Sequence, residues 1–175
     1  MIETAAIIPN QDMTTKRPLQ MTSTIRHATP SDLAAIQAIS DKAYAVHVAA
    51  MGRKPGPMLA DYPAHLAADV VLVATDGDGV VRGYAVILDQ PDGFWLDNIA
   101  VDQAAQGQGI GGRLLAAVES WLRQRTGRYS LYTHVRMTAN IAWYGRAGFT
   151  ETGRRRVNGF DRVYFEKHFS QPKDK

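Results

Sequence analysis

Residues 106–113 read Gln-Gly-Gln-Gly-Ile-Gly-Gly-Arg and lie between a strand-like run at 94–101 and a segment with the apolar spacing of a helix. Glycine lets the backbone turn tightly and brings its N–H groups close to a bound anion. The start of a helix adds the positive end of a dipole. The stretch therefore predicts a phosphate-binding turn between a strand and a helix.

Two well-known phosphate loops do not fit this stretch. Gly107, Gly109 and Gly112 satisfy the spacing of the dinucleotide fingerprint. That motif also needs an acidic residue about 20 positions later, and positions 120–150 contain no acid. A Walker loop would need a lysine followed by serine or threonine where Arg113 stands.

The third alternative is the pyrophosphate loop of acetyl-CoA-binding transferases. Its pattern is Gln or Arg, two residues, Gly, one residue, then Gly or Ala, and it is met by Gln106, Gly109 and Gly111. A tight turn without any ligand is the structural alternative. The residues around this loop distinguish a pyrophosphate loop from a turn without a ligand.

Outward from the loop, the pattern alternates between strand-like and helix-like segments. Strands are expected at 23–28, 70–74, 80–88, 94–101, 129–135, 149–157 and 160–169. Helices are expected from 29 towards 50, at 61–68, from the glycine loop to Gly127, and at 138–147. Asp76-Gly77-Asp78-Gly79 and Asn158-Gly159 are hairpin signals. This order predicts a mixed sheet with helices on its faces.

The composition predicts a single globular domain. The chain has 175 residues, of which 45% are hydrophobic and 21% charged. We expect a tail at 1–22, for which Met21 offers an alternative start, one domain at 23–169 and a second tail at 170–175. Residues 1–22 do not resemble a signal peptide, and the apolar runs are shorter than the roughly 20 residues that span a bilayer.

Charge and cysteine content exclude several classes of function. The chain has no cysteine, which excludes disulfides and thiolate sites and fits a cytoplasmic location. Its five histidines show no metal-ligand spacing, so we expect no metal. The net charge is only +3, and the run Arg154–Arg156 favours a solvated strand edge over a nucleic-acid patch. No nucleic acid or membrane partner is expected.

Three motifs together resemble the GCN5-related N-acetyltransferase (GNAT) family over about residues 24–167. Leu96–Val101 resembles the fourth strand of the family, the loop at 106–111 its phosphate loop, and Asn140–Tyr144 with Gly148-Phe149 its late helix and sixth strand. The motifs occur in the family's order and at its usual spacing. The resemblance implies an α/β (α+β) fold with a mixed, mostly antiparallel sheet, splayed fourth and fifth strands, and helices on both faces.

The resemblance also implies that acetyl-CoA is the cosubstrate. An unpaired edge of the fourth strand would bind the amides of the pantetheine arm as if they were a strand, and the loop would bind the pyrophosphate. The implied cofactor-binding residues are Ile99, Ala100, Val101, Gln106, Gly107, Gln108, Gly109, Ile110, Gly111, Gly112, Arg113 and Asn140.

The implied reaction is direct attack of a neutral primary amine, most simply that of a small molecule, on the thioester. A protein N-terminus or lysine is the alternative acceptor, and a non-catalytic acyl-CoA-binding regulatory module is the alternative function. Family members often pair through their sheets or late strands, so the resemblance also allows a homodimer. Acceptor choice is expected in residues 51–62 and in the hairpin at Asn158-Gly159, because loops on a rigid scaffold usually carry specificity.

Two residues are candidates for the chemistry. By its place in the family motif, Tyr144 is the general acid that protonates the leaving thiolate; its alternative is a core tyrosine. Asp97 is either the base, acting through a water, or a charge that attracts the amine. Strand alternation predicts that Leu96 and Asn98 share the face opposite Asp97. Asn140 either contacts the cofactor or caps or stabilises its helix. His134 is either structural or has a catalytic or acceptor-orienting part.

Overall fold

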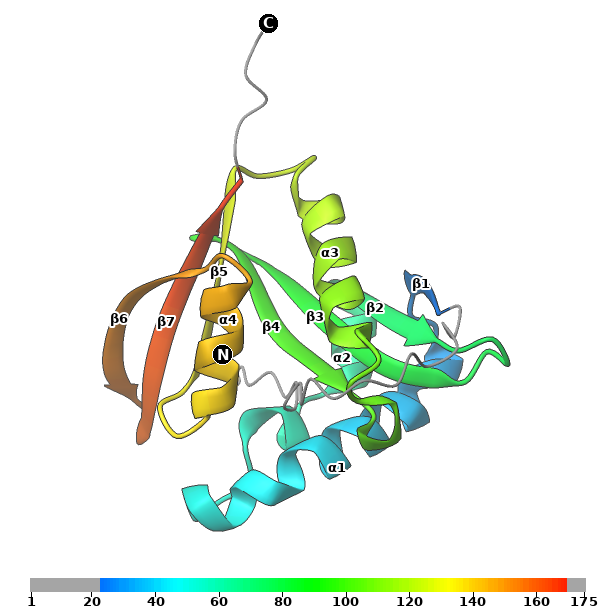
Figure 1. Cartoon of the computed structure of the whole chain (residues 1–175), viewed down its shortest axis with the longest axis horizontal. Helices are drawn as coiled ribbons and strands as arrows, with labels where there is room; N and C mark the ends of the chain where they lie inside the picture. The colour runs from blue at the N-terminus through cyan, green and yellow to red at the C-terminus, as the bar shows by residue number, and fades with distance from the viewer. Residues whose placement is uncertain (1–22, 170–175) are drawn as a thin grey trace, which may run out of the picture.

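A single sheet of seven strands organises the computed structural model, which describes residues 23–169 (Figure 1). The strands are β1 (Thr24–His27), β2 (Val70–Thr75), β3 (Val81–Gln90), β4 (Gly93–Val101), β5 (Arg128–His134), β6 (Thr150–Val157) and β7 (Phe160–His168). Their order across the sheet is β1-β2-β3-β4-β5-β7-β6. Neighbours pair antiparallel except β4 and β5, which are parallel.

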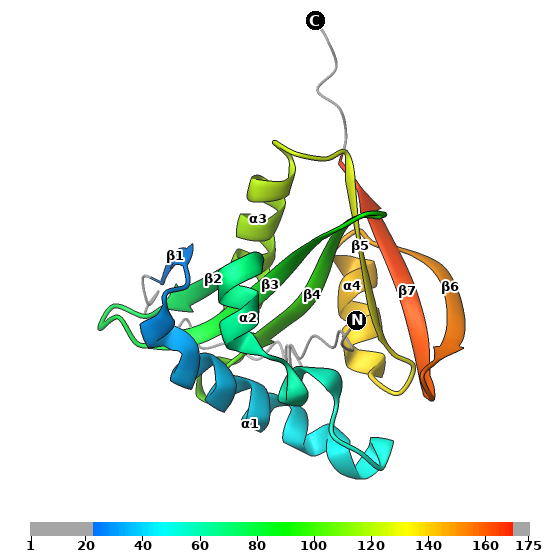
Figure 2. The ribbon, with the colours of Figure 1, turned by 180° about the vertical axis from the view of Figure 1, so that it is seen from behind.

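Helices cover both faces of this sheet. They are α1 (Leu33–Met51), α2 (Tyr62–Ala68), α3 (Ile110–Leu122) and α4 (Thr138–Arg146), with short 3₁₀ turns η1 (Pro30–Asp32), η2 (Gly56–Leu59) and η3 (Gln103–Ala105). α3 and α4 lie on the face that is towards the viewer in Figure 1, and α1 and α2 lie on the face seen in Figure 2. The buried side chains accordingly form two apolar clusters, one on each side of the sheet.

The expected mixed sheet and its order of elements are confirmed, with one clear difference at the end of α3. This helix ends at Leu122 and not at Gly127. The backbone N–H groups of Arg125 and Thr126 both bond to the Leu122 carbonyl, which closes the helix early. The Gly127 carbonyl instead accepts from the Phe169 N–H at 2.8 Å, so this glycine already lies against the end of β7.

Gly83 sets the distance between α3 and the sheet. A Cβ built on this β3 residue would lie 2.9 Å from the Ala100 carbonyl oxygen, 3.0 Å from the Leu114 side chain and 3.3 Å from Ile110. The backbone contact cannot relax without moving β4. A glycine here therefore allows the first turn of α3 to pack closely on β3 and β4.

Candidate active site

The two edges of β4 are paired very differently. Along β3 the ladder runs from Gly83↔Val101 to Gln90↔Gly93, whereas along β5 the described pairing consists of Trp95↔Ser130. Beyond that pair the two ribbons diverge (Figure 1). The β5-facing edge of β4 at 97–101 is thus outside the ladder, which fits the expected splayed strands.

The three β4 residues expected to bind pantetheine have buried side chains. Ile99 and Val101 point into the α3-side cluster, and Ala100 points into the α1-side cluster. Their side chains are therefore part of the hydrophobic core. Any contact with a cofactor has to come from their backbone N–H and C=O groups.

A β-bulge places Asp97 outside the regular alternation of β4. The register between β3 and β4 shifts at this residue. Leu96 packs in the α3-side cluster, whereas Asn98 bonds to Tyr44 of α1 on the opposite face. The prediction that Leu96 and Asn98 share a face is therefore wrong, because the extra residue in the bulge resets the alternation. Asp97 itself is 5% exposed.

Asn98 is the centre of a buried hydrogen-bond network under the bulge. Its Oδ1 accepts from the Tyr44 hydroxyl at 2.7 Å, and its Nδ2 donates to the hydroxyls of Tyr62 at 3.1 Å and Tyr84 at 2.9 Å. The Tyr62 hydroxyl also lies 3.0 Å from Ser40 Oγ. The network ties α1, α2 and β3 to the strand position next to Asp97.

Burial keeps these tyrosines protonated. It raises the pKa of Tyr62 to about 12, and it raises the pKa values of Tyr44 and Tyr84 well above the ordinary phenol value. Besides burial and the other two tyrosines, Tyr144 and Asp97 also raise the pKa of Tyr44. These two candidate catalytic residues, from α4 and β4, therefore lie in the electrostatic neighbourhood of one α1 residue.

Tyr144 is fully buried on the α3 side of the sheet. Its ring packs against Phe149 at 5.4 Å and Phe165 at 5.7 Å between centroids. The ring of Tyr144 is therefore part of the hydrophobic core, and this packing fixes the position of its phenol oxygen. Its role as a general acid stays a prediction.

The glycine loop turns through two left-handed residues. Gly107 has φ 77° and Gly109 has φ 76°, values that favour glycine. α3 starts directly after Gly109, and its first intrahelical bond runs from the Arg113 N–H to the Gly109 carbonyl at 3.1 Å. The amides of residues 110–112 precede that bond, so they form the donor-rich end of the helix. Gln106 leans back towards β4, with Nε2 3.5 Å from the Val101 carbonyl.

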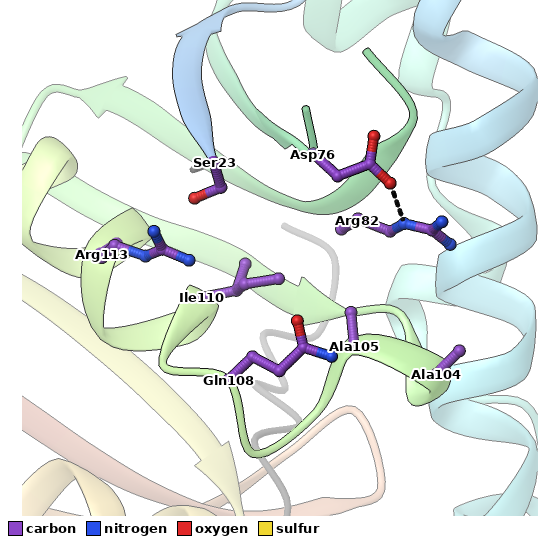
Figure 3. Close-up of a pocket in the computed structure, with 8 residues that line it drawn as sticks. All are labelled: Ser23, Asp76, Arg82, Ala104, Ala105, Gln108, Ile110 and Arg113. Atoms are coloured by element: carbon purple, nitrogen blue, oxygen red, sulfur yellow. Dashed lines mark hydrogen bonds and ion pairs between the residues drawn. The ribbon is translucent and has the colours of Figure 1, made fainter. Parts of the chain in front are cut away.

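A small cavity of about 120 Å³ lies on the β2–β3 side of this loop (Figure 3). It is lined by Ser23, Asp76, Arg82, Ala104, Ala105, Gln108, Ile110 and Arg113. Arg82 is neutralised there by Asp76 at 2.8 Å and Asp102 at 3.1 Å. Ligand pockets typically measure about 300–1,000 Å³, so the cavity is too small to hold acetyl-CoA. Gln108 and Arg113 face it, and their cofactor roles stay predictions.

Asn140 is not the cap of α4. The N-cap position belongs to Met137, and the buried amide of Asn140 lies in the first turn with Nδ2 3.5 Å from the Met137 sulfur. Asn140 therefore does not cap α4, whereas its roles in stabilising the helix and in contacting the cofactor stay predictions. Sulfur is a weak acceptor, so this amide keeps capacity for a further hydrogen bond.

Residues 51–62 and the hairpin at Asn158-Gly159, which are expected to select the acceptor, are in contact. Arg53 donates to the Asn158 carbonyl at 3.0 Å, and its guanidinium carbon lies 3.1 Å from the ring centroid of Phe160. His134 packs edge-on to the same ring, and its Nδ1 accepts from the Arg136 N–H at 3.2 Å. Burial lowers the pKa of His134; Asp161 opposes this shift, and Arg136 and Arg53 add to it.

Two important residues were not found from the sequence: Gly83 and Asn98. An amide inside an apolar strand was a usable signal for Asn98, whereas Gly83 depends on packing between segments far apart in the chain. Within residues 23–169 no group of three or more His, Cys, Asp or Glu side chains could hold a metal ion. The same residues contain no helix with the length and hydropathy that a membrane span requires.

Comparison with known proteins agrees with this geometry. Residues 67–151 match the acetyltransferase (GNAT) domain. No curated protein is significantly similar in sequence.

Solved structures similar to the chain include three acetyltransferases or proteins described with acetyl-CoA. The ribosomal-protein-S18-alanine N-acetyltransferase of Escherichia coli has a TM-score of 0.70 and 24% identity, covering 87% of this chain and 97% of its own. The ribosomal-protein-alanine N-acetyltransferase of Brucella melitensis has a TM-score of 0.63 and 26% identity, covering 83% and 99%. The protein yncA of Salmonella typhimurium, solved with its cofactor acetyl-CoA, has a TM-score of 0.65 and 22% identity, covering 88% and 98%. With its splayed β4 and β5 and its matched segment at 67–151, the chain carries an acetyltransferase (GNAT) domain and has the fold of these acetyltransferases.

Proposed function

We propose that the protein transfers the acetyl group of acetyl-CoA to the primary amine of a small molecule, by direct attack in a ternary complex. One observation carries the proposal: the edge of β4 at 97–101 lies outside the sheet ladder and runs directly into the glycine loop at the start of α3. An unpaired strand edge suits a chain of secondary amides, and helix-start amides suit a pyrophosphate.

The residues of the site divide the work of cofactor binding. The backbone of Ile99, Ala100 and Val101 would pair with pantetheine, and the amides of the 106–113 loop would receive the phosphates. Asn140, with its buried amide on α4, would add one side-chain hydrogen bond. When bound, acetyl-CoA supplies the thioester that the amine attacks.

Two side chains would handle the protons. An aliphatic amine is protonated at pH 7, since amines of the lysine type have a pKa of about 10.4. Asp97 would accept that proton through a water, and Tyr144 would donate a proton to the thiolate leaving group. The packing of the buried Tyr144 ring fixes the position of its phenol oxygen, and a fixed proton donor suits proton transfer in the transition state.

The acceptor side favours a small substrate. Arg53 bridges from the segment after α1 to the β6–β7 hairpin, and an extended polypeptide would have to pass this bridge. Two structural neighbours are named as ribosomal-protein-alanine N-acetyltransferases, so a protein N-terminus is the alternative acceptor. The proposal also includes a cytoplasmic location and a homodimer, and sedimentation tests the latter.

The decisive experiment combines cofactor binding with an acceptor panel. Calorimetry measures acetyl-CoA binding, and CoA release is followed over small primary amines, an alanine-initiated peptide and a lysine peptide, with and without enzyme. We expect binding and faster release with small amines. Binding without acetylation of any amine would instead identify a regulatory acyl-CoA-binding module.

A further inference from the structure

Arg162 lies on the sheet face opposite α4. Its neighbours Val163 and Phe165 pack in the α3-side cluster, so Arg162 and Tyr164 point the other way. In the register, Arg162 pairs with His134 of β5 on one side. This is the face that carries His134 and that is bordered by Arg53.

The guanidinium of Arg162 is buried without an anionic partner. The residue is only 4% exposed, and its Nε has no hydrogen-bond partner. Its Cζ lies 4.2 Å from the ring centroid of Tyr132, and within residues 23–169 it forms no ion pair. Adjacent Asp161 lies 4.0 Å from Arg156 and is half-exposed. Burying an unpaired charge is unfavourable, so this arginine is suited to bind an anion from outside the chain.

The surroundings of Arg162 favour an anion over a cation. Arg53 and Arg136 both act on the neighbouring His134, and Asp161 is the acid that opposes them. Beside this positive region lies an aromatic floor. Trp95, Tyr132 and Tyr164 are 5.4–6.4 Å apart between ring centroids, and Trp95 stands two residues before Asp97 on β4.

We propose that Arg162 binds a carboxylate of the acceptor, so that the substrate is a primary amine of the amino-acid type with an apolar or aromatic side chain. The inference rests on the proposed function. Nε and one terminal nitrogen of a guanidinium form a planar fork that matches a carboxylate. The free Nε supplies half of that fork, and the floor of Trp95, Tyr132 and Tyr164 accommodates the side chain.

The first test measures acceptor preference. Phenylalanine is compared with 2-phenylethylamine, and methionine with 3-(methylthio)propylamine, in the full-length enzyme at saturating acetyl-CoA. We expect kcat/KM to favour the carboxylate-bearing amine by about 10- to 100-fold, the range of a charged hydrogen-bonded pair. Arg162→Met should abolish this preference. Arg154→Met, a control on the neighbouring strand β6 whose exposed guanidinium pairs with Glu151, should keep it.

The second test detects the carboxylate site without acetyl transfer. The CoA-saturated enzyme is titrated by calorimetry with 3-phenylpropanoate and with 3-phenylpropanamide. The acid should bind at least tenfold more tightly, and Arg162→Met should lose that difference. Arg162→Lys keeps the charge but not the fork, so it should lose most of the difference even if the methionine variant fails to fold.

The outcomes separate the two proposals. Equal binding of acid and amide, or wild-type binding of the acid in both Arg162 variants, overturns the carboxylate site. Acetylation of simple amines with no preference for a carboxylate also overturns it and leaves the proposed function standing. Acid binding through Arg162 without acetylation of any amine supports the site and refutes the proposed transfer.

Discussion

The two edges of β4 show how one strand can serve as scaffold and as site. The edge towards β3 is paired from Gly93 to Val101 except at the bulge residue Asp97, and Asn98 next to the bulge is held by the buried hydrogen-bond network. The edge towards β5 is paired at Trp95 and then diverges. Because the first edge and its network hold the strand in place, the second can leave its backbone groups outside the sheet without loss of order.

This difference leads to a separation of effects. Changes on the β5 side, at the loop, Tyr144 or Asp97, should alter binding or turnover while the protein stays folded. Changes on the β3 side, in the Asn98 network, should alter stability first. Four substitutions test whether effects on activity and on stability separate in this way.

The largest effect is expected from Gly109→Val. The left-handed φ of 76° at this position is unfavourable for a β-branched residue, and the side chain would stand where the loop amides meet the phosphates. We expect acetyl-CoA binding to be abolished in calorimetry. Gly79→Val is the matched control, since Gly79 has φ 81° in the β2–β3 hairpin, and it should lose stability but keep cofactor affinity. Unchanged affinity in folded Gly109→Val would remove this loop from the cofactor site.

Tyr144→Phe should lower kcat by about 10²- to 10⁴-fold, the usual contribution of a general acid. The KM for acetyl-CoA should change little, because the proton is needed only in the transition state. Tyr129→Phe is the control, as its buried hydroxyl donates to Glu119 on α3 at 2.8 Å; it should cost stability and spare kcat. Full activity of Tyr144→Phe, with chemistry shown to be rate-limiting, contradicts the acid role.

Asn98→Ala tests the paired side of β4. It leaves the hydroxyls of Tyr44, Tyr62 and Tyr84 without their shared amide, so the free energy of unfolding should fall by about 3 kcal/mol. Chemical denaturation measures this loss. Gln37→Ala removes an exposed bond to Asp41 on α1 and should change stability by less than about 0.5 kcal/mol. If both variants unfold at the same denaturant concentration, the network does not hold β4.

Asp97→Asn should give the smallest effect, since the short side chain acts through a water. Loss of a base removes the acidic limb of the pH–rate profile, whereas loss of an attracting charge raises the acceptor KM at every pH. Asp92→Asn, which alters the nearby bond to Trp95 Nε1, should leave the profile unchanged. If neither parameter moves in Asp97→Asn, the amine loses its proton directly to solvent.

The sequence predicted the features that local chemistry decides. The hairpin at Asn158-Gly159 has the two positive φ values, 52° and 80°, that these residue types favour. The glycine loop likewise has its two left-handed residues at Gly107 and Gly109. In both places a few consecutive residues determine the backbone, so they could be recognised without a structure.

The features that were missed depend on residues far apart in the chain. The bond between Tyr44 and Asn98 joins positions separated by 54 residues, and the bulge that moves Asp97 out of alternation accompanies it. Arg162 meets Tyr132 across β5 and β7. Periodicity assumes a regular strand, so it could not show where β4 departs from regularity or which arginine is buried.

Gly83 constrains how this protein can change by mutation. A single methyl group at this position would touch the carbonyl of β4 and two side chains of α3 together. The space between β3, the edge of β4 and the first turn of α3 is therefore limited by this one residue. Neither the strand edge nor the helix start can drift in evolution without the other, and an engineer who replaces Gly83 to raise the β-propensity of β3 would move both halves of the cofactor site at once.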